Sequence, residues 1–248
     1  MIRIAAIATL VALAAPAHAA EIKVFATGAV SQAVQDIVGA FEKDTGHKIV
    51  ASFGTAGGIG KKLTDGEKAD VVFSSLGGLR DAKAFLVEAE PIVVGRVRMG
   101  MAVKQGAARP DISSADKFKD VLLAASTVSW PDPAQGATTG IHFSKTLEQM
   151  GILEPMKAKA VYGRDGADVS KAVAEGKAQI GFTQTTEIQG VPGVDVGGMM
   201  PDTYQLVSSY AVALTKEGAS SAAAKDFFAA VTSAKGVETF ARRGFDVK

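Results

Sequence analysis

The chain contains no cysteine and few histidines, the residues that most often build metal and redox centres. Only three of its 248 residues are histidine. The absence of cysteine excludes disulfides, thiolate nucleophiles and cysteine-ligated metal sites. His47 and His142 lie far apart in the sequence, and nothing in their spacing indicates a shared zinc site. We therefore expect no metal and no cofactor.

The chain also lacks a surplus of charge of either sign. Lys and Arg together number 27, and Asp and Glu together number 26. Proteins that bind nucleic acids or anionic membrane surfaces rely on basic surfaces, so we expect neither partner. Hydrophobic residues make up 47% of the chain and charged residues 21%, as in an ordinary globular protein of one large domain or two lobes.

The first residues have the layout of a secretory signal peptide. Arg3 is an early cation, residues 4–15 are apolar, and the segment closes on Ala17-His18-Ala19. The apolar run is too short to span a bilayer, and the small residues are typical of a signal-peptidase site. We predict a signal peptide over 1–19, cleavage after Ala19 and export to the periplasm. A retained membrane anchor is the alternative.

Strand-like and helix-like stretches alternate along the rest of the chain, which is typical of α/β proteins. Short apolar strands are predicted over 22–25, 48–53, 69–73, 127–130, 160–162 and 179–183. Longer strand-like runs at 91–103 and 206–214 interrupt this alternation. Helical periodicity places Val30, Val34, Ile37 and Phe41 on one face of a helix that closes near Gly46.

Several strand-to-helix turns are rich in small and hydroxyl-bearing residues. In open α/β sheets, ligands bind at the carboxyl ends of the strands. Helix N-termini at that edge offer unpaired N–H groups that suit an anion. Helix capping alone explains any one of these turns, but together they favour a cleft for a small anion. We expect backbone N–H donors from Thr27–Ala29, Thr55–Gly58 and Thr138–Gly140.

Five short segments follow one another in a characteristic order along the chain. They are Ile22-Lys23-Val24-Phe25-Ala26, Ser52-Phe53-Gly54-Thr55, Gly66-Glu67-Lys68-Ala69-Asp70-Val71-Val72-Phe73-Ser74, Asp132-Pro133 and Arg243-Gly244-Phe245. In this order and spacing the chain resembles the molybdate-binding periplasmic protein family of bacterial ABC importers. The resemblance implies a type II periplasmic binding protein, an α/β fold of two lobes joined by a hinge of two crossover strands. Lobe one would comprise 20–95 plus 211–248, and lobe two 96–210.

Three side-chain positions depart from the pattern of that family, which holds a tetrahedral oxyanion with serine and tyrosine hydroxyls and backbone N–H groups. Ala29 and Ala56 fall where serines are expected, and Gln184 falls at the tyrosine position. Replacement hydroxyls are available from Thr27, Thr55 and Thr139. Because a lost hydrogen bond to a charged ligand is costly, we expect molybdate to bind weakly or not at all.

Two arginines indicate an organic acid as the ligand instead. Arg164 lies in the turn after the strand 160–162, and Arg96 lies at the hinge. A guanidinium group binds a carboxylate through two parallel hydrogen bonds. The alternative for Arg164 is a surface ion pair with Asp165 or Asp168.

These observations predict a periplasmic solute-binding protein of an ABC importer, a monomer that captures a small anion, either an organic carboxylate or an oxyanion, for a permease in the inner membrane. The alternative is an enzyme, because the resemblance extends to a periplasmic aconitate isomerase, which would act on a tricarboxylate by proton transfer. His142 and Glu187 are the candidate catalytic residues for that reaction. The predicted ligand-binding residues are Thr27, Gly28, Ala29, Thr55, Ala56, Gly57, Ser74, Arg96, Thr138, Thr139, Arg164, Val169 and Gln184.

Overall fold

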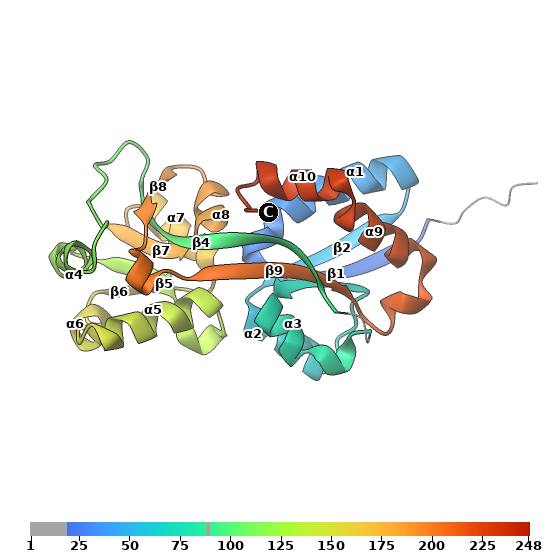
Figure 1. The fold of residues 1–248 in the computed structure, drawn as a ribbon, viewed down its shortest axis with the longest axis horizontal. Coiled ribbons are helices and arrows are strands. Elements are labelled where there is room, and N and C mark those ends of the chain that lie inside the picture. Colours follow the sequence, from blue (N-terminus) through green and yellow to red (C-terminus); the bar gives the residue numbers. More distant parts are fainter. Residues whose placement is uncertain (1–18, 88–89) are drawn as a thin grey trace, which may run out of the picture.

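Two long antiparallel strands run through both halves of the molecule (Figure 1). They are β4 (Ile92–Lys104) and β9 (Val207–Leu214), paired with Arg96 opposite Ser209. The computed structural model describes residues 19–87 and 90–248, so the predicted signal peptide lies almost wholly outside the described residues. Within those ranges no helix is both long and apolar enough to cross a bilayer.

The first half is an α/β layer built on parallel strands. β1 lies between β2 and β3 and runs parallel to both, and β3 pairs with β9. The strands are β1 (Glu21–Thr27), β2 (Lys48–Gly54) and β3 (Val71–Ser75). One face of this half-sheet packs against α1 (Ser31–Thr45), α9 (Ala222–Thr232) and α10 (Ala234–Arg242), and the other against α2 (Ala56–Thr64) and α3 (Leu76–Asp81).

The second half repeats this plan. β5 lies between β6 and β7 and is parallel to both, and β4 pairs antiparallel with β7 and β8. The strands are β5 (Val128–Pro131), β6 (Ala160–Gly163), β7 (Ile180–Gln184) and β8 (Val194–Met199). One face packs against α4 (Ala115–Ala124), α5 (Thr138–Gln149) and α6 (Leu153–Lys157), and the other against α7 (Gly166–Ala174) and α8 (Thr185–Gln189).

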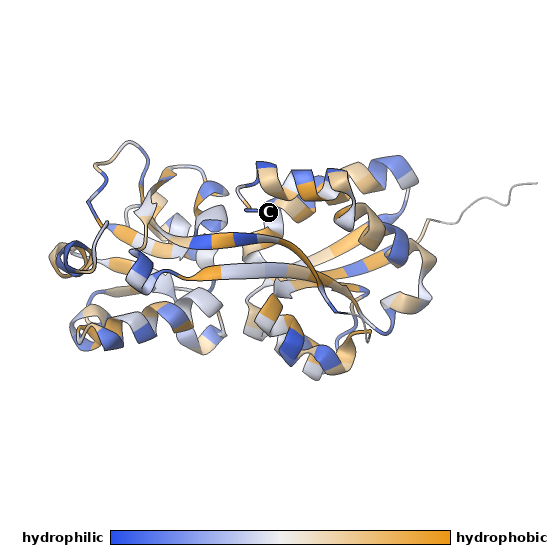
Figure 2. Cartoon of the chain, in the orientation of Figure 1, coloured by the Kyte–Doolittle hydropathy of each residue, from blue (hydrophilic) through white to orange (hydrophobic). Residues whose placement is uncertain are grey.

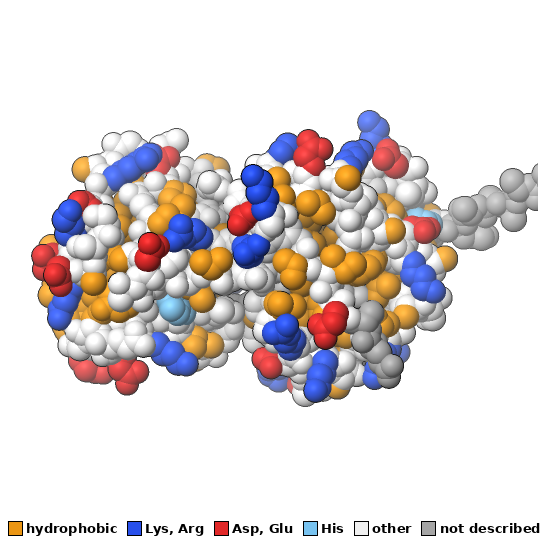
Figure 3. Space-filling model, in the orientation of Figure 1, with side chains coloured by type: hydrophobic (Ala, Val, Ile, Leu, Met, Phe, Trp, Pro, Cys, Tyr) orange, Lys and Arg blue, Asp and Glu red, His pale blue; other side chains and the backbone are white. Residues whose placement is uncertain are grey.

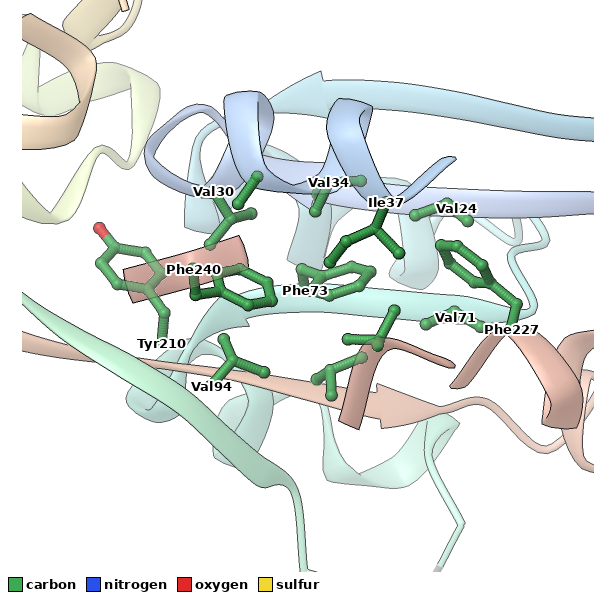
Figure 4. Packing of buried hydrophobic residues seen from close by; sticks show 14 of the residues in the cluster. Val24, Val30, Val34, Ile37, Val71, Phe73, Val94, Tyr210, Phe227 and Phe240 are labelled. Atoms are coloured by element: carbon green, nitrogen blue, oxygen red, sulfur yellow. The ribbon is translucent and has the colours of Figure 1, made fainter. Parts of the chain in front are cut away.

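Each half has its own hydrophobic core, because each half-sheet carries apolar residues on both faces. The apolar colour follows the strands and the inner faces of the helices (Figure 2). In the first half, Phe73 and Phe240 lie at the centre of one cluster with Phe227 at its edge (Figure 4). In the second half, the rings of Phe143 and Phe182 stack with centroids 4.7 Å apart. Both cores are therefore complete within their own half.

The predicted strands and the two long crossover runs are present. The helices α5 and α7 begin at Thr138 and Gly166. β8 and the short helices α3, α6 and α8 were not predicted, because segments of five or six residues carry too little periodicity. The predicted lobe bounds remain a prediction. β4 pairs with β9 up to Arg98, with β7 from Met99 onward and with β8 from Gly100 onward.

We expect Phe143→Ala to destabilise the protein by about 3–5 kcal/mol, because it removes a fully buried ring from a stacked pair. Urea denaturation followed by circular dichroism measures this change. The matched control is Gln149→Ala on the exposed side of the same helix, for which we expect a change within about 0.5 kcal/mol. Equal effects of the two substitutions would contradict the assignment of Phe143 to the core.

Candidate functional site

The carboxyl ends of the parallel strands in the two halves face each other across one small cavity. Its volume is about 30 Å³, roughly the space of one water molecule in the liquid. It lies beyond the ends of β1, β2 and β3 on one side and of β5, β6 and β7 on the other, the position at which open α/β sheets bind ligands. The lining residues are Thr27, Gly28, Ala29, Gly54, Thr55, Ala56, Ser75, Ala137, Thr138, Thr139, Asp165, Gly166, Gln184, Glu187 and Tyr210.

Helix N-termini form much of the cavity wall. The first residues of α2, α5 and α7 line it, as does the 3-10 turn η1 (Gly28–Val30) that leads into α1. The first-turn N–H groups of a helix have no partner within the helix, and the helix dipole makes that end electropositive. The wall therefore presents polar N–H donors without any charged donor.

Two buried polar atoms in the wall have no hydrogen-bond partner in the described structure. They are the hydroxyl of Thr27, a residue 5% exposed, and Oε1 of Gln184, a residue 1% exposed. The amide nitrogen of Gln184 donates to the Ser208 hydroxyl at 2.8 Å, which leaves the amide oxygen free. Because buried polar groups are nearly always paired, these two atoms indicate that a ligand completes the site.

The cavity contains two acidic side chains. The Thr183 hydroxyl donates to Oε2 of Glu187 at 2.7 Å, and Asp165 caps α7 by accepting from the N–H of Asp168. Burial raises the pKa of Glu187 to about 7, and the charge of Asp165 adds to the rise. Hydrogen bonds from the Thr183 hydroxyl and from backbone N–H groups partly offset it. Glu187 is therefore able to gain or lose a proton near neutral pH.

Tyr210 brings a phenol to the cavity from the crossover strand β9. Its ring packs at the edge of the first-half core, and its hydroxyl points out of that cluster (Figure 4). Burial and the neighbouring Glu187 raise the pKa of Tyr210, so the phenol stays protonated and is able to donate a hydrogen bond.

None of the described residues that line the cavity is Lys, Arg or His. Charged side chains of both signs are scattered over the visible surface instead (Figure 3). Among the described residues there is also no cluster of three or more His, Cys, Asp or Glu arranged to hold a metal ion. An anion in this cavity would be held by neutral donors.

The two halves touch directly beside the cavity. The N–H of Gly57 in α2 donates to the carbonyl of Gly136 at 3.0 Å, and the Thr55 hydroxyl donates to the carbonyl of Gln135. A Cβ on Gly57 would lie 2.8 Å from the Cα of Gly136, so this close approach requires glycine. Next to this contact, a groove of about 490 Å³ shares Ala56, Ser75 and Thr138 with the cavity.

The structure brings many of the predicted ligand-binding residues to the cavity and places others elsewhere. Those that line it are Thr27, Gly28, Ala29, Thr55, Ala56, Thr138, Thr139 and Gln184, together with the candidate catalytic residue Glu187. Those that do not are Gly57, Ser74, Arg96, Arg164 and Val169, together with the second candidate catalytic residue His142.

Both predicted arginines lie outside the cavity, contrary to the expectation of a guanidinium–carboxylate contact. Arg164 precedes the N-cap of α7, and its side chain is 84% exposed and turns back to pair with Asp168 on the surface. Arg96 is exposed on β4, where its guanidinium donates to the carbonyl of Lys248 and its backbone pairs with Asp246.

The other displaced residues are held by local packing. Ser74 is 2% exposed and its hydroxyl lies towards α3, where a Cβ on Gly78 would approach it to 2.8 Å, whereas Ser75, the N-cap of α3, lines the cavity. The side chain of Val169 is fully buried and lies against Gly163 and Gly181. The His142 ring contacts the carbonyl of Tyr204 at 2.8 Å on the outer side of α5. The Gly57 N–H already bonds Gly136.

Sequence reasoning missed several lining residues, chiefly Ser75, Asp165, Gly166 and Tyr210. Asp165 and Gly166 lay in a predicted turn, and the Asp-Gly pair before a helical pattern is itself an N-cap signal. Tyr210 lay near the middle of a predicted crossover strand, where a strand passes the cleft between the halves. No local pattern indicates which face of that strand the ring takes.

Comparisons with known proteins agree with this geometry. The family model described as bacterial extracellular solute-binding protein matches residues 22–246. The chain is 32% identical over 227 residues to an aconitate isomerase from Pseudomonas sp, which covers 87% of this chain and 84% of that protein. It is 29% identical over 220 residues to the molybdate-binding protein ModA of Azotobacter vinelandii, covering 82% and 81%.

The fold comparison points the same way. The solved structure of the Azotobacter vinelandii periplasmic molybdate-binding protein superposes with a TM-score of 0.73 at 20% identity, covering 92% of this chain and 99% of that one. This likeness confirms the predicted fold class, a two-lobed α/β periplasmic binding protein.

We expect Gly57→Ala to weaken binding of a ligand between the halves by about tenfold or more, because the added methyl group would hold α2 away from Gly136. Isothermal titration calorimetry with whichever of sulfate, phosphate, citrate and aconitate binds most tightly measures the effect. Small-angle scattering of the same sample should give a larger radius of gyration than that of the wild type.

Gly39→Ala is the matched control. It lies in α1 and gains the same helix propensity, but its added Cβ would meet no atom within 4 Å, and it lines neither the cavity nor the groove. Equal affinities of the two variants would show that the Gly57–Gly136 contact does not matter for ligand capture.

Proposed function

The chain belongs to the bacterial extracellular solute-binding protein family, and on that premise we propose that it captures a small anion between its two halves for delivery to an ABC permease in the inner membrane. Membership of this extracellular family indicates that the protein acts outside the cytoplasm. The observation that supports an anionic ligand is the cavity wall. Helix N-termini from both halves surround the Thr27 hydroxyl, which has no hydrogen-bond partner in the described structure. Such a wall suits negative charge.

The donor set supports an anion other than molybdate. Ala29 and Ala56 line the cavity and provide no hydroxyl. Asp165 and Glu187 add negative charge that repels a dianion in a site without Lys, Arg or His. The hydroxyls that remain on the wall are those of Thr27, Thr55, Ser75, Thr138, Thr139 and Tyr210.

The size of the cavity implies that the halves move apart when the ligand enters. About 30 Å³ is too little for a whole di- or tricarboxylate. The adjoining groove of about 490 Å³ offers room for the remainder of an organic acid once its charged group occupies the cavity. The crossover strands β4 and β9 are the elements about which such a movement takes place.

We expect Thr27→Val to lower the affinity for the bound anion by about 10- to 150-fold, because it removes a hydroxyl donor to a charged group. The substitution keeps the shape of the side chain and breaks no hydrogen bond in the described structure, so the melting temperature of the free protein should hardly change. Calorimetry with molybdate, sulfate, phosphate, citrate and both aconitates tests affinity and ligand together.

Thr232→Val serves as the control, because its hydroxyl bonds the carbonyl of Phe228 in α9, outside the cavity. An unchanged affinity in Thr27→Val would remove Thr27 from the site. Absence of binding by every anion in the panel would contradict the proposed function. Submicromolar binding of molybdate would instead indicate that the ligand is molybdate, as in the names of the ModA relatives.

A second candidate function is isomerisation of aconitate or a similar acid, as the name of the relative from Pseudomonas sp suggests. The observation that favours it is Glu187, a carboxyl group in the cavity whose pKa is raised to about 7. Such a group is able to take a proton from one carbon of an unsaturated acid and return it to another. His142, the other candidate, has no contact with the cavity and takes no part in this proposal.

We expect isomerisation, if it occurs, to be abolished in Glu187→Gln, because an amide neither accepts nor returns the proton. Proton NMR of cis- and trans-aconitate incubated with the protein in D2O follows both isomer ratio and deuterium uptake. His142→Gln is the control and should retain the wild-type rate. No deuterium uptake with the wild-type protein would leave binding as the function of the cavity.

A further inference from the structure

The polar wall of the cavity combines hydrogen-bond donors with acceptors. Helix N-termini from both halves supply donors, and Gln184 and Glu187 of the second half supply acceptors. Gln184 Oε1 is an amide oxygen, which only accepts, and it is buried without a partner in the described structure. Glu187 contributes a carboxyl group that no Lys, Arg or His of the described lining neutralises. An anion that only accepts hydrogen bonds would leave these acceptors unpaired.

We propose that Glu187 and Gln184 select anions that carry their own proton donor, a hydroxyl on an organic acid or a protonated oxygen on an oxyanion. The inference rests on the proposed function, since it assumes that the cavity binds an anion. A site built to accept a hydrogen bond rejects the analogue that lacks the donor, because its buried acceptor is then left without a partner.

The position of Glu187 fits this role better than a role in capping alone. As the third residue of α8, it lies where a carboxyl group often turns back to the helix N-cap. Thr183 occupies Oε2, but Oε1 lies at the junction of the halves, where a Cβ on Gly28 would approach it to 2.6 Å. Because position 28 is glycine, the carboxyl group of Glu187 has room to lie against the first half, beside the cavity.

Few titratable groups face this carboxyl group. Asp165 faces it from the N-terminus of α7, and Tyr210 faces it from β9; Gly28 of η1 and Thr183 of β7 bring no charge. Burial and Asp165 both favour the protonated form of Glu187, whose pKa is raised to about 7. Below pH 7 Glu187 therefore donates to any anion, and above pH 7 it accepts only from a ligand that brings a proton.

The experiment uses calorimetry between pH 6 and pH 9 to compare anions that differ in one donor and carry nearly the same charge at pH 8. Malate against succinate tests the hydroxy acid, and phosphate against sulfate tests the protonated oxyanion. At pH 8 we expect the member with the donor to bind about 10- to 150-fold more tightly in at least one pair. Succinate or sulfate should lose affinity about tenfold per pH unit above pH 7, because Glu187 must first take up a proton.

In Glu187→Gln, whose amide donates at every pH, the pH slope should vanish and the preference should fall at least about tenfold. Asp165→Asn keeps a capping residue and removes the neighbouring charge that raises the pKa of Glu187, so the slope for succinate or sulfate should begin at a lower pH. Glu175→Gln is the control, since this acid pairs with Lys177 on the surface, and it should behave like the wild type. Circular dichroism verifies that each variant is folded.

The outcomes separate the two proposals. Equal affinities within both pairs, or a preference and slope that survive in Glu187→Gln, would overturn the selectivity inference and leave anion capture intact. The wild-type protein tests the inference without any variant, because affinities for succinate and sulfate that stay constant above pH 7 would also overturn it. Binding of none of these four anions or of the acids in the wider panel would overturn the proposed function, and the inference with it.

Discussion

The antiparallel pairing of β4 with β9 is the constraint on which the arrangement of the molecule depends. β4 belongs to both half-sheets, since its first part pairs with β9 and its second part with β7 and β8, whereas β9 joins β4 to β3 in the first half. This shared pair orients the halves so that the carboxyl ends of their parallel strands face one another. The cavity exists because six strand ends and the helices that follow them converge on one point.

The chemistry of the cavity follows from what those strand ends provide. Helices that begin there contribute N–H groups and a favourable dipole without any cation. Burial of Glu187 disfavours its charged form, and the charge of Asp165 adds to this effect. On the proposed function, a balance between neutral donors and these acids governs the affinity for an anion, and protonation of Glu187 shifts that balance.

The relatives show how one fold serves different chemistry. A molybdate-binding protein and an aconitate isomerase both match most of the chain, and the fold alone does not decide between binding and catalysis. The chemistry of such a fold is decided by the side chains at its site. Here these include Ala29 and Ala56, which add no hydroxyl, and Glu187, which adds a proton that is exchangeable near neutral pH.

Local sequence determined the strands, the longer helices and the cluster of small residues at the strand ends, because hydrophobic periodicity and capping act over a few residues. It also predicted Thr27, Thr55 and Thr138 near one site, and the family resemblance added Gln184. Only the tertiary structure decided that Ser75 rather than Ser74 faces the cavity, that Arg164 turns to Asp168, and that Tyr210 enters from β9. A shift of one residue along a strand reverses the side-chain direction, and contacts between distant segments depend on how the halves pack.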